Sequence, residues 1–280
     1  MFLTRKLKHY IALSCCLLFV GSYAIANDSC ALLTKKQIQK NQHLSEDAIR
    51  YAPYAIFSNN AYHRVKPLPL PEGWREVSEL RNEATDSGLE LTVFEKHEGD
   101  NLIEVVVAFR GTDERKDWIQ NMVPFFRKQV PPAEIEFGKV IEHYKGQNAK
   151  ITTTGHSLGG GLALHMSFTH PDVDAIAFNS SPVTKAGSDP IMTNKRVSIW
   201  ESGELLQGPR NSVNWARERW RYTKRIEFRF LHGSPIKLHL MEGFALNITK
   251  LGALTSKSLQ AVIDQFCEQN SQTIVQTSNP

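Results

Sequence analysis

The chain has 280 residues, of which 41% are hydrophobic and 22% charged, enough apolar material for a folded domain with a substantial core. Its 33 basic and 29 acidic residues give a formal net charge of +4. Three of the basic residues and none of the acidic ones lie in residues 1–26, so the rest of the chain carries only +1. The charge therefore gives no support for nucleic-acid binding.

Residues 1–26 have the pattern of a secretory signal peptide. Arg5, Lys6 and Lys8 precede an apolar run over residues 11–20, and the small residues at 24 and 26 suit a cleavage site after Ala26. The run is short for a membrane span; an uncleaved anchor is the alternative. We expect a secreted or periplasmic protein with a single domain over residues 27–280.

Two cysteines, Cys30 and Cys267, remain when residues 1–26 are removed. They stand near opposite ends of the remaining chain. Chain termini often lie close together in a domain, and export permits disulfides. We therefore predict a Cys30–Cys267 disulfide; two unpaired thiols are the alternative.

The pattern of apolar residues predicts alternating helices and strands. Ser45 is expected to cap the first helix, within which Pro53 is tolerated or marks a kink. Residues 27–42 are expected to be peripheral, and residues 270–280 frayed. The expected elements are a helix at 45–57, a proline-rich loop at 66–73, a half-buried strand at 89–94, a buried strand at 103–109, a helix at 131–145, a strand at 150–154, a helix at 158–170, strands at 175–178 and 197–200, and a helix at 239–254. This alternation predicts an α/β fold with a mostly parallel sheet and helices on its faces.

The segment Gly155-His156-Ser157-Leu158-Gly159 contains the pattern G-x-S-x-G between a predicted strand and a predicted helix. In that setting a sharp, strained turn lifts the serine hydroxyl clear of the sheet. Side chains at Gly155 and Gly159 would collide with the neighbouring strand and helix. The free N–H groups at the helix N-terminus favour the negative charge that develops in acyl transfer. We predict that Ser157 is a nucleophile.

Upstream, the buried run at 105–109 ends in Arg110-Gly111-Thr112, and Asp117-Trp118 follows. Together with the serine motif, this segment resembles the class 3 lipase family over roughly residues 45–250. The resemblance implies an α/β-hydrolase fold and hydrolysis of lipid carboxylic esters through an acyl-enzyme on Ser157. It also implies that Thr112 and Leu158 supply the backbone N–H groups of the oxyanion hole, whereas Arg110 is buried against a carboxylate and is structural.

A serine nucleophile needs a histidine base, and in this fold the chain order is serine, acid, histidine. His165 and His170 lie on the helix that follows Ser157 and cannot reach back to it. His232 and His239 remain. His239 precedes the last apolar helix, where the family places its base, and we favour it over His232.

The acid is less clearly marked, because no aspartate follows the strand at 197–200. Glu204 follows a glycine and precedes two apolar residues, as the family's acid does, and is preferred. Glu201, closer to the strand end, is the alternative, and Asp189 is the third candidate.

Two segments carry possible lipid contacts. Trp118, Ile119 and Met122 belong to an apolar cluster that forms either a lid over the site or the buried face of a helix. Residues 215–230 alternate aromatic and basic side chains, which suits anionic headgroups or, as we prefer, an ordinary solvated face.

The sequence thus predicts a lipase or esterase that meets its lipid or ester substrate at a membrane or lipid–water interface. A phospholipase A1-type acyl hydrolase is the main alternative. A catalytically inactive module that binds lipid or a partner is the third possibility. No metal-ligand spacing, phosphate loop or dinucleotide motif occurs, so no metal and no cofactor are predicted.

Overall fold

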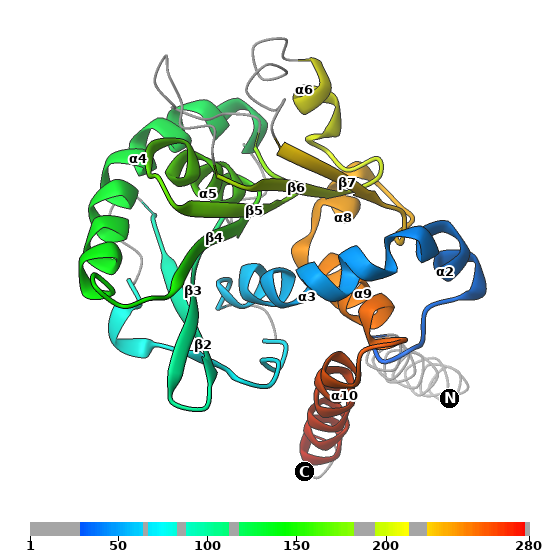
Figure 1. The fold of residues 1–280 in the computed structure, drawn as a ribbon. Helices are drawn as coiled ribbons and strands as arrows, with labels where there is room; N and C mark the ends of the chain where they lie inside the picture. Colours follow the sequence, from blue (N-terminus) through cyan, green and yellow to red (C-terminus); the bar gives the residue numbers. More distant parts are fainter. Residues whose placement is uncertain are drawn as a thin grey trace, which may run out of the picture.

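The computed structural model describes residues 29–63, 67–82, 88–111, 118–181, 194–212 and 223–277, so the predicted signal peptide lies outside the described residues. Within these ranges the strands form one seven-stranded sheet in the order β1 to β7 (Figure 1). The first two pairings are antiparallel and the other four are parallel. The strands are β1 (Trp74–Glu76), β2 (Leu91–Glu98), β3 (Asn101–Phe109), β4 (Lys150–His156), β5 (Val173–Phe178), β6 (Arg196–Glu201) and β7 (Thr223–Phe228).

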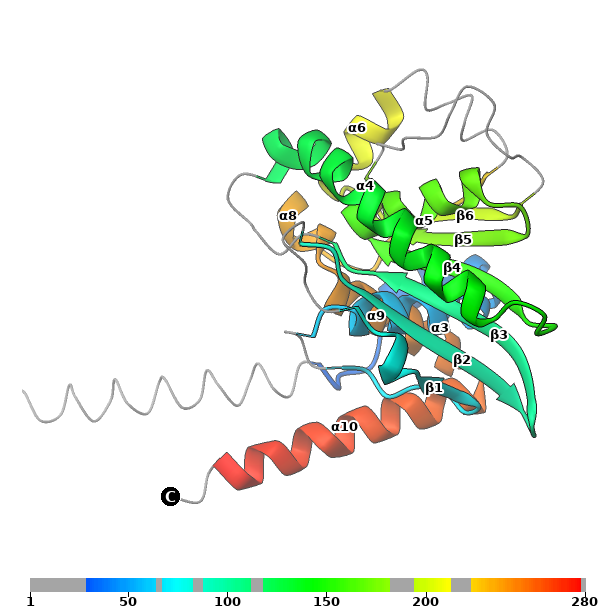
Figure 2. The same cartoon turned by 90° about the vertical axis from the view of Figure 1, so that its left-hand side faces the viewer.

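Helices cover both faces of the sheet, with α4 and α5 on one face and α3 and α9 on the other (Figure 2). The described helices are α2 (Lys35–Asn41), α3 (Ser45–Asn60), α4 (Trp118–His143), α5 (Leu158–Thr169), α6 (Gln207–Ser212), α8 (Pro235–His239), α9 (Met241–Ala253) and α10 (Lys257–Thr277), with 3-10 turns η1 (Gln42–Leu44) and η2 (Ser78–Leu80). The predicted α/β fold, with a mostly parallel sheet between helical layers, is confirmed.

The strand β3 shows why the core has two halves. Its side chains alternate between the faces: Val105 and Val107 pack toward α4 and α5, whereas Val106 packs toward α3 and α9. Both faces are covered, as predicted for this run. The prediction of a half-buried strand at 89–94 was wrong, because β2 begins at Leu91 and its first five residues are all buried. Phe94 stacks on a phenylalanine of α3 with ring centroids 4.5 Å apart.

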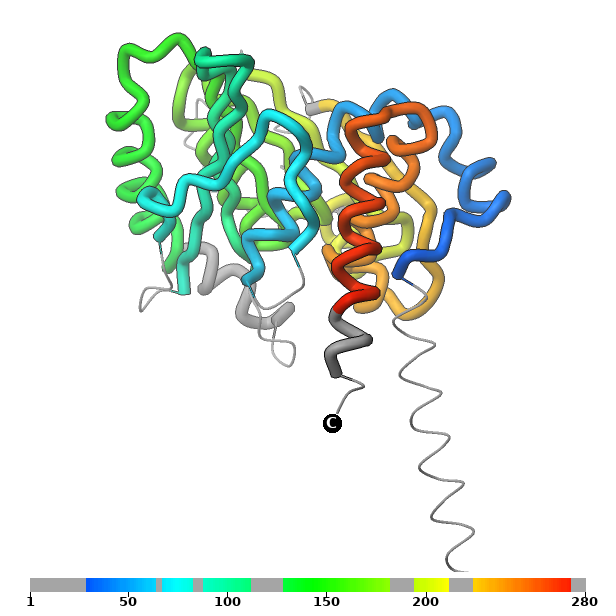
Figure 3. Tube along the Cα trace, turned by 90° about the horizontal axis from the view of Figure 1, so that it is seen from below, coloured from blue at the N-terminus to red at the C-terminus, as the bar shows by residue number. Residues whose placement is uncertain are grey.

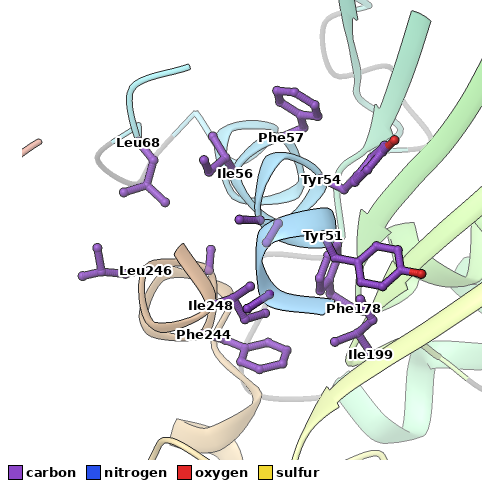
Figure 4. Close-up of a cluster of buried hydrophobic side chains, with 14 of the residues drawn as sticks. Tyr51, Tyr54, Ile56, Phe57, Leu68, Phe178, Ile199, Phe244, Leu246 and Ile248 are labelled. Carbon is purple, nitrogen blue, oxygen red and sulfur yellow. The ribbon is translucent and has the colours of Figure 1, made fainter. Parts of the chain in front are cut away.

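The helices α3 and α9 form the larger core with the sheet (Figure 4). Phe57 of α3, Phe244 of α9 and Phe178 of β5 all meet there. The predicted Ser45 cap was wrong: η1 runs directly into α3, so Leu44 takes the cap position and the Ser45 hydroxyl donates to a carbonyl of η1. Pro53 lies inside α3, so it is tolerated.

Two predicted helix boundaries were also wrong. Helical periodicity continues through residues 118–130, so α4 begins at Trp118 and ends at His143 despite three prolines in its sequence. The expected helix at 239–254 is α9, which begins only at Met241, because Leu240 is extended (φ −66°, ψ 133°) between α8 and α9. His239 is consequently the last residue of α8.

The N-terminal end of the described chain lies beside α10 (Figure 3). Cys30 and Cys267 are joined by a disulfide with their Cα atoms 5.7 Å apart, as predicted. The Lys250 ammonium donates to the carbonyls of Ser29 and Ala31 at 2.8 and 2.6 Å. These contacts fix the N-terminal segment against α9, and α10 packs beside it.

Both terminal segments are more ordered than expected. The helix α10 extends to Thr277, beyond the predicted start of a frayed tail. The supposedly peripheral stretch at 27–42 contains α2, whose Asn41 is fully buried and exchanges hydrogen bonds with the backbone of Arg229. In the segment 215–230, the described part after residue 222 is β7 and its exit. No helix among the described residues has both the length and the apolar character needed to cross a bilayer.

Candidate active site

Ser157 occupies the sharp turn between β4 and α5. Its backbone has φ 57° and ψ −119°, a conformation that is strained for any residue with a side chain. The turn is held from the neighbouring strand: the Ser157 N–H donates to the Phe178 carbonyl at 3.0 Å, and the Ser181 N–H donates to the Ser157 carbonyl at 2.8 Å. The predicted strained turn is therefore confirmed.

The glycines on either side allow three backbone segments to touch. A Cβ on Gly159 would lie 2.1 Å from the carbonyl oxygen of Phe109, and one on Gly155 would lie 2.5 Å from the carbonyl carbon of Gly159. The predicted collisions are thus confirmed. At the end of β3, a Cβ on Gly111 would lie 2.6 Å from the carbonyl oxygen of His156. The segment after β3 therefore begins in contact with the serine turn.

Of the two predicted oxyanion donors, Leu158 is the first residue of α5, directly after Ser157. Thr112 lies outside the described residues, as does Asp189. Trp118, Ile119 and Met122 form the first turns of α4, but their side chains also lie outside the description.

A histidine and a glutamate meet beside the serine turn. The Nδ1 of His239 and the Oε2 of Glu204 are 2.6 Å apart, and both side chains are buried. Burial alone would raise the pKa of Glu204, but the hydrogen bond from His239 and the positive charge of Arg210 outweigh it and lower that pKa. The carboxylate is therefore ionised and accepts the hydrogen of Nδ1, which leaves Nε2 of neutral His239 as a proton acceptor. Burial lowers the pKa of His239 despite Glu204, so the neutral form predominates at neutral pH.

Arg210 of α6 was not found by sequence reasoning. Its Nη2 pairs with the Oε1 of Glu204, and its Nη1 donates to the Ser180 carbonyl at 2.8 Å. The Leu206 N–H donates to the Oε2 of Glu204 at 2.8 Å. Both carboxylate oxygens are therefore held. The only sequence signal was indirect: a buried carboxylate needs donors, and Arg210 lies shortly after it.

The alternative acid lies in a different environment. Glu201 is fully buried, and its Oε1 accepts from the N–H groups of Phe230 and Leu231 at 2.8 and 3.0 Å. Burial raises the pKa of Glu201 to about 8. The structure thus brings Glu204, and not Glu201, to His239.

The other candidate residues have different surroundings. His232 is exposed in the loop before α8. His165 lies on α5 and contacts Glu134 at 3.0 Å. Arg110 pairs with the carboxylate of Glu90, so its predicted structural role is confirmed.

His239 reaches the serine turn through residue 156. The rings of His156 and His239 have centroids 4.7 Å apart, and the His156 Nε2 lies 2.6 Å from the His239 carbonyl oxygen. Ser157 is only 2% exposed, and in the part of the chain that the structure describes its Oγ makes no hydrogen bond. Apo sites often have loose catalytic hydrogen bonds that tighten around substrate.

A mostly parallel sheet with a strained serine turn after a central strand, followed along the chain by a glutamate and then a histidine that meet each other, defines an α/β-hydrolase. A family model described as the Tle-like phospholipase domain matches residues 53–196, just over half of the chain. The chain therefore belongs to the Tle-like phospholipase family. The matched region includes Ser157 and ends before Glu204 and His239.

Individual relatives are more distant. An extracellular phospholipase A1 of Serratia liquefaciens is 29% identical over 101 residues, which cover 33% of this chain and 30% of that protein. The chain thus aligns with less than a third of this relative's length. Lipase II from Rhizopus niveus matches with a TM-score of 0.41 at 13% identity, covering 59% of this chain and 76% of that one. A hyperthermophilic esterase from Pyrobaculum calidifontis matches with a TM-score of 0.38 at 11% identity, covering 80% and 99%. The match to the Tle-like phospholipase domain is what confirms the predicted kinship with lipid ester hydrolases.

Proposed function

We propose that the chain is an exported serine hydrolase that cleaves carboxylic ester bonds of lipids, with phospholipids as its substrate class. The observation that carries the proposal is the buried Glu204–His239 pair, which lies against the strained Ser157 turn. Membership of the Tle-like phospholipase family supports the choice of phospholipids, as does the similarity to a phospholipase A1. The Cys30–Cys267 disulfide supports export, because disulfides persist in oxidising compartments. The resemblance to class 3 lipases belongs to the same proposal.

In the first step, the Oγ of Ser157 attacks the carbonyl carbon of the ester while Nε2 of His239 takes the hydroxyl proton. The negative charge on the former carbonyl oxygen is stabilised by the N–H of Leu158 at the start of α5. By family resemblance, the N–H of Thr112 is the second donor. Backbone donors at a helix N-terminus suit this task, because they are already oriented before charge develops.

The tetrahedral intermediate then collapses. Its C–O bond to the leaving alcohol breaks, and His239 gives its proton to that alcohol, which leaves an acyl ester on Ser157. A water molecule repeats the sequence: it loses a proton to His239, attacks the acyl carbon and releases the fatty acid with Ser157 restored.

In both steps Glu204 holds Nδ1–H of His239 and stabilises the imidazolium that forms. Arg210 and the Leu206 N–H keep the carboxylate in place. The apolar first turns of α4 (Trp118, Ile119 and Met122) belong to the proposal as a lid or wall of the acyl groove at the lipid–water interface.

The test combines an active-site probe with a lipid panel. Wild-type protein should react with a fluorophosphonate and release fatty acid from a diacyl phospholipid, but not from a matched dialkyl ether phospholipid. Ser157→Ala should lose both activities, with a fall in rate on the order of a million-fold. Ser180→Ala is the matched control: its hydroxyl is also buried and makes no hydrogen bond among the described residues, so both activities should persist.

Each alternative has its own outcome. A folded Ser157→Ala variant with wild-type hydrolysis would overturn the proposed nucleophile. Cleavage of triglyceride without cleavage of phospholipid would leave an ester hydrolase but overturn the substrate class. A folded wild-type protein that neither reacts with the probe nor cleaves any ester would leave only the inactive binding module.

A further inference from the structure

A second histidine lies in the site. His156 directly precedes Ser157, is 5% exposed, and makes one side-chain contact through each ring nitrogen. Its Nδ1 lies 2.8 Å from the hydroxyl of Tyr62, and its Nε2 lies 2.6 Å from the carbonyl oxygen of His239. Tyr62 follows the C-terminal end of α3, so the contact joins three distant parts of the chain.

The directions of these hydrogen bonds follow from the groups involved. A carbonyl oxygen only accepts, so the Nε2 of His156 carries the hydrogen. Burial and the nearby His239 hold the pKa of His156 well below its usual value, and the ring is therefore neutral with a single N–H. The Nδ1 then accepts, and the Tyr62 hydroxyl must donate. The two hydrogen bonds therefore point in the same direction: Tyr62 donates to His156, and His156 donates to the backbone carbonyl of His239.

The carbonyl that receives this bond stands at a helix end. His239 is the last residue of α8, and the extended Leu240 that follows prevents the helix from supplying a donor to it. Side chains supply the donors instead: His156, and Asn179 through its Nδ2 at 3.2 Å. Asn179 directly follows β5.

We propose that His156, with Tyr62 behind it, is a positioning residue that fixes the backbone of His239 relative to Ser157. The inference rests on the proposed function. Glu204 fixes the rotation of the His239 ring, whereas His156 fixes the position of the His239 backbone that carries the ring. Since His156 is covalently next to Ser157, its hydrogen bond to the His239 carbonyl fixes the position of the base relative to the nucleophile.

The same pair also touches the turn beside the oxyanion donor. A Cβ on Gly111, next to Thr112, would lie 2.1 Å from the Tyr62 hydroxyl and 2.6 Å from the His156 carbonyl oxygen. Tyr62 thus fills the space that a side chain at Gly111 would occupy. One connected set of contacts therefore spans the base, the nucleophile and the start of the oxyanion turn.

The test compares three variants at a soluble short-chain ester, with active sites counted by fluorophosphonate labelling. His156→Leu keeps much of the volume but removes the donor, and should lower kcat by about 10- to 100-fold, with little change in KM. His156→Gln retains an N–H where Nε2 was and should recover activity to within about fivefold of wild type. Tyr62→Phe should lower kcat at least about threefold. His165→Leu is the matched control, because that buried histidine lies on α5 and contacts Glu134 instead; its kcat should be unchanged.

Thermal unfolding of each variant separates positioning from folding. If His156→Leu and His156→Gln are equally active, or if folded His156→Leu matches wild type, the proposal is overturned while the hydrolase assignment stands. If His156→Leu does not fold, a folded Tyr62→Phe variant with wild-type kcat overturns it. Absence of Ser157-dependent hydrolysis in wild-type protein would instead overturn the proposed function, and this proposal with it.

Discussion

Replacing Glu204 with glutamine tests the proposed role of Glu204 as the triad acid, because the donors around it decide how the introduced amide can be oriented. Its Oε1 faces the guanidinium of Arg210, which only donates, so the amide oxygen of the introduced glutamine must turn toward Arg210. The amide nitrogen then replaces Oε2, where two other donors, the Leu206 N–H and the Nδ1–H of His239, now point. The reverse orientation would leave a buried guanidinium facing an NH₂ group, which costs more.

The consequence falls on His239. To accept from the new amide, its Nδ1 must lose its hydrogen, and neutral imidazole then carries that hydrogen on Nε2. The Nε2 can no longer take the proton of Ser157. Loss of the correct tautomer costs about 10⁴-fold in kcat, or roughly 5.4 kcal/mol of transition-state stabilisation. KM should change little, because Glu204 does not contact substrate in the proposed mechanism.

Glu201→Gln is the matched control. Glu201 holds its proton up to a pH of about 8, so glutamine imitates its neutral form, and the carbonyl oxygen can still accept from the Phe230 and Leu231 N–H groups. Both variants should be assayed at pH 7 on one soluble ester, with circular dichroism to establish folding. Near-normal kcat in folded Glu204→Gln, or a loss of about 10⁴-fold in Glu201→Gln, would refute the reasoning.

The remaining predictions concern stability and are read from urea unfolding. Folded protein keeps the Glu201 proton up to pH about 8, whereas the ordinary pKa is 4.5, so wild-type stability should fall as pH rises between these values. The unfolding free energy of Glu201→Gln relative to wild type should therefore rise by up to about 1.4 kcal/mol per pH unit over this range. A difference that stays constant with pH would contradict this. Gly159→Ala should cost about 3 kcal/mol, because its Cβ would lie 2.1 Å from a backbone carbonyl oxygen. Gly138→Ala on α4, with open space around its Cβ, should instead stabilise by about 0.5–1 kcal/mol; equal effects would refute the packing argument. Reduction of the Cys30–Cys267 disulfide, which closes a loop of 237 residues, should lower the unfolding free energy by up to about 5 kcal/mol. If a variant with both cysteines replaced by serine still loses unfolding free energy on addition of reductant, the effect does not come from this disulfide.

The sheet was predictable where the local pattern matched the final environment. In the run predicted at 103–109, residues 105–109 are apolar on both faces, and helices do cover both faces of β3 there. The strand β1 has only three residues, and its pairing with β2 is a long-range contact with no local signal. The helix α2 did carry a signal, since Thr34 and Gln37 form a capping box, but its polar composition hid it.

In the site, predictability followed the presence of a recognisable pattern and not distance along the chain. Ser157 and its glycines form one local motif, so their geometry followed from steric limits on the backbone. His239 was located by its position before the last apolar helix, although that helix begins later than predicted. The contact between Arg210 and Glu204 depends on the turn of the chain between β6 and α6. The spacing of apolar residues does not predict that turn.

The proposed use of glutamate as the acid has a physical requirement. Glutamate has one more rotatable bond than aspartate, so a glutamate acid must be restrained at more points to orient a histidine equally well. Glu204 meets that requirement through donors at both oxygens, Arg210 on one side and the Leu206 N–H with His239 on the other. The restraint also has an electrostatic effect, because the positive charge of Arg210 opposes protonation of His239. The arrangement therefore stabilises the imidazolium less than Glu204 alone would. In return, His239 stays neutral and correctly oriented in a buried site.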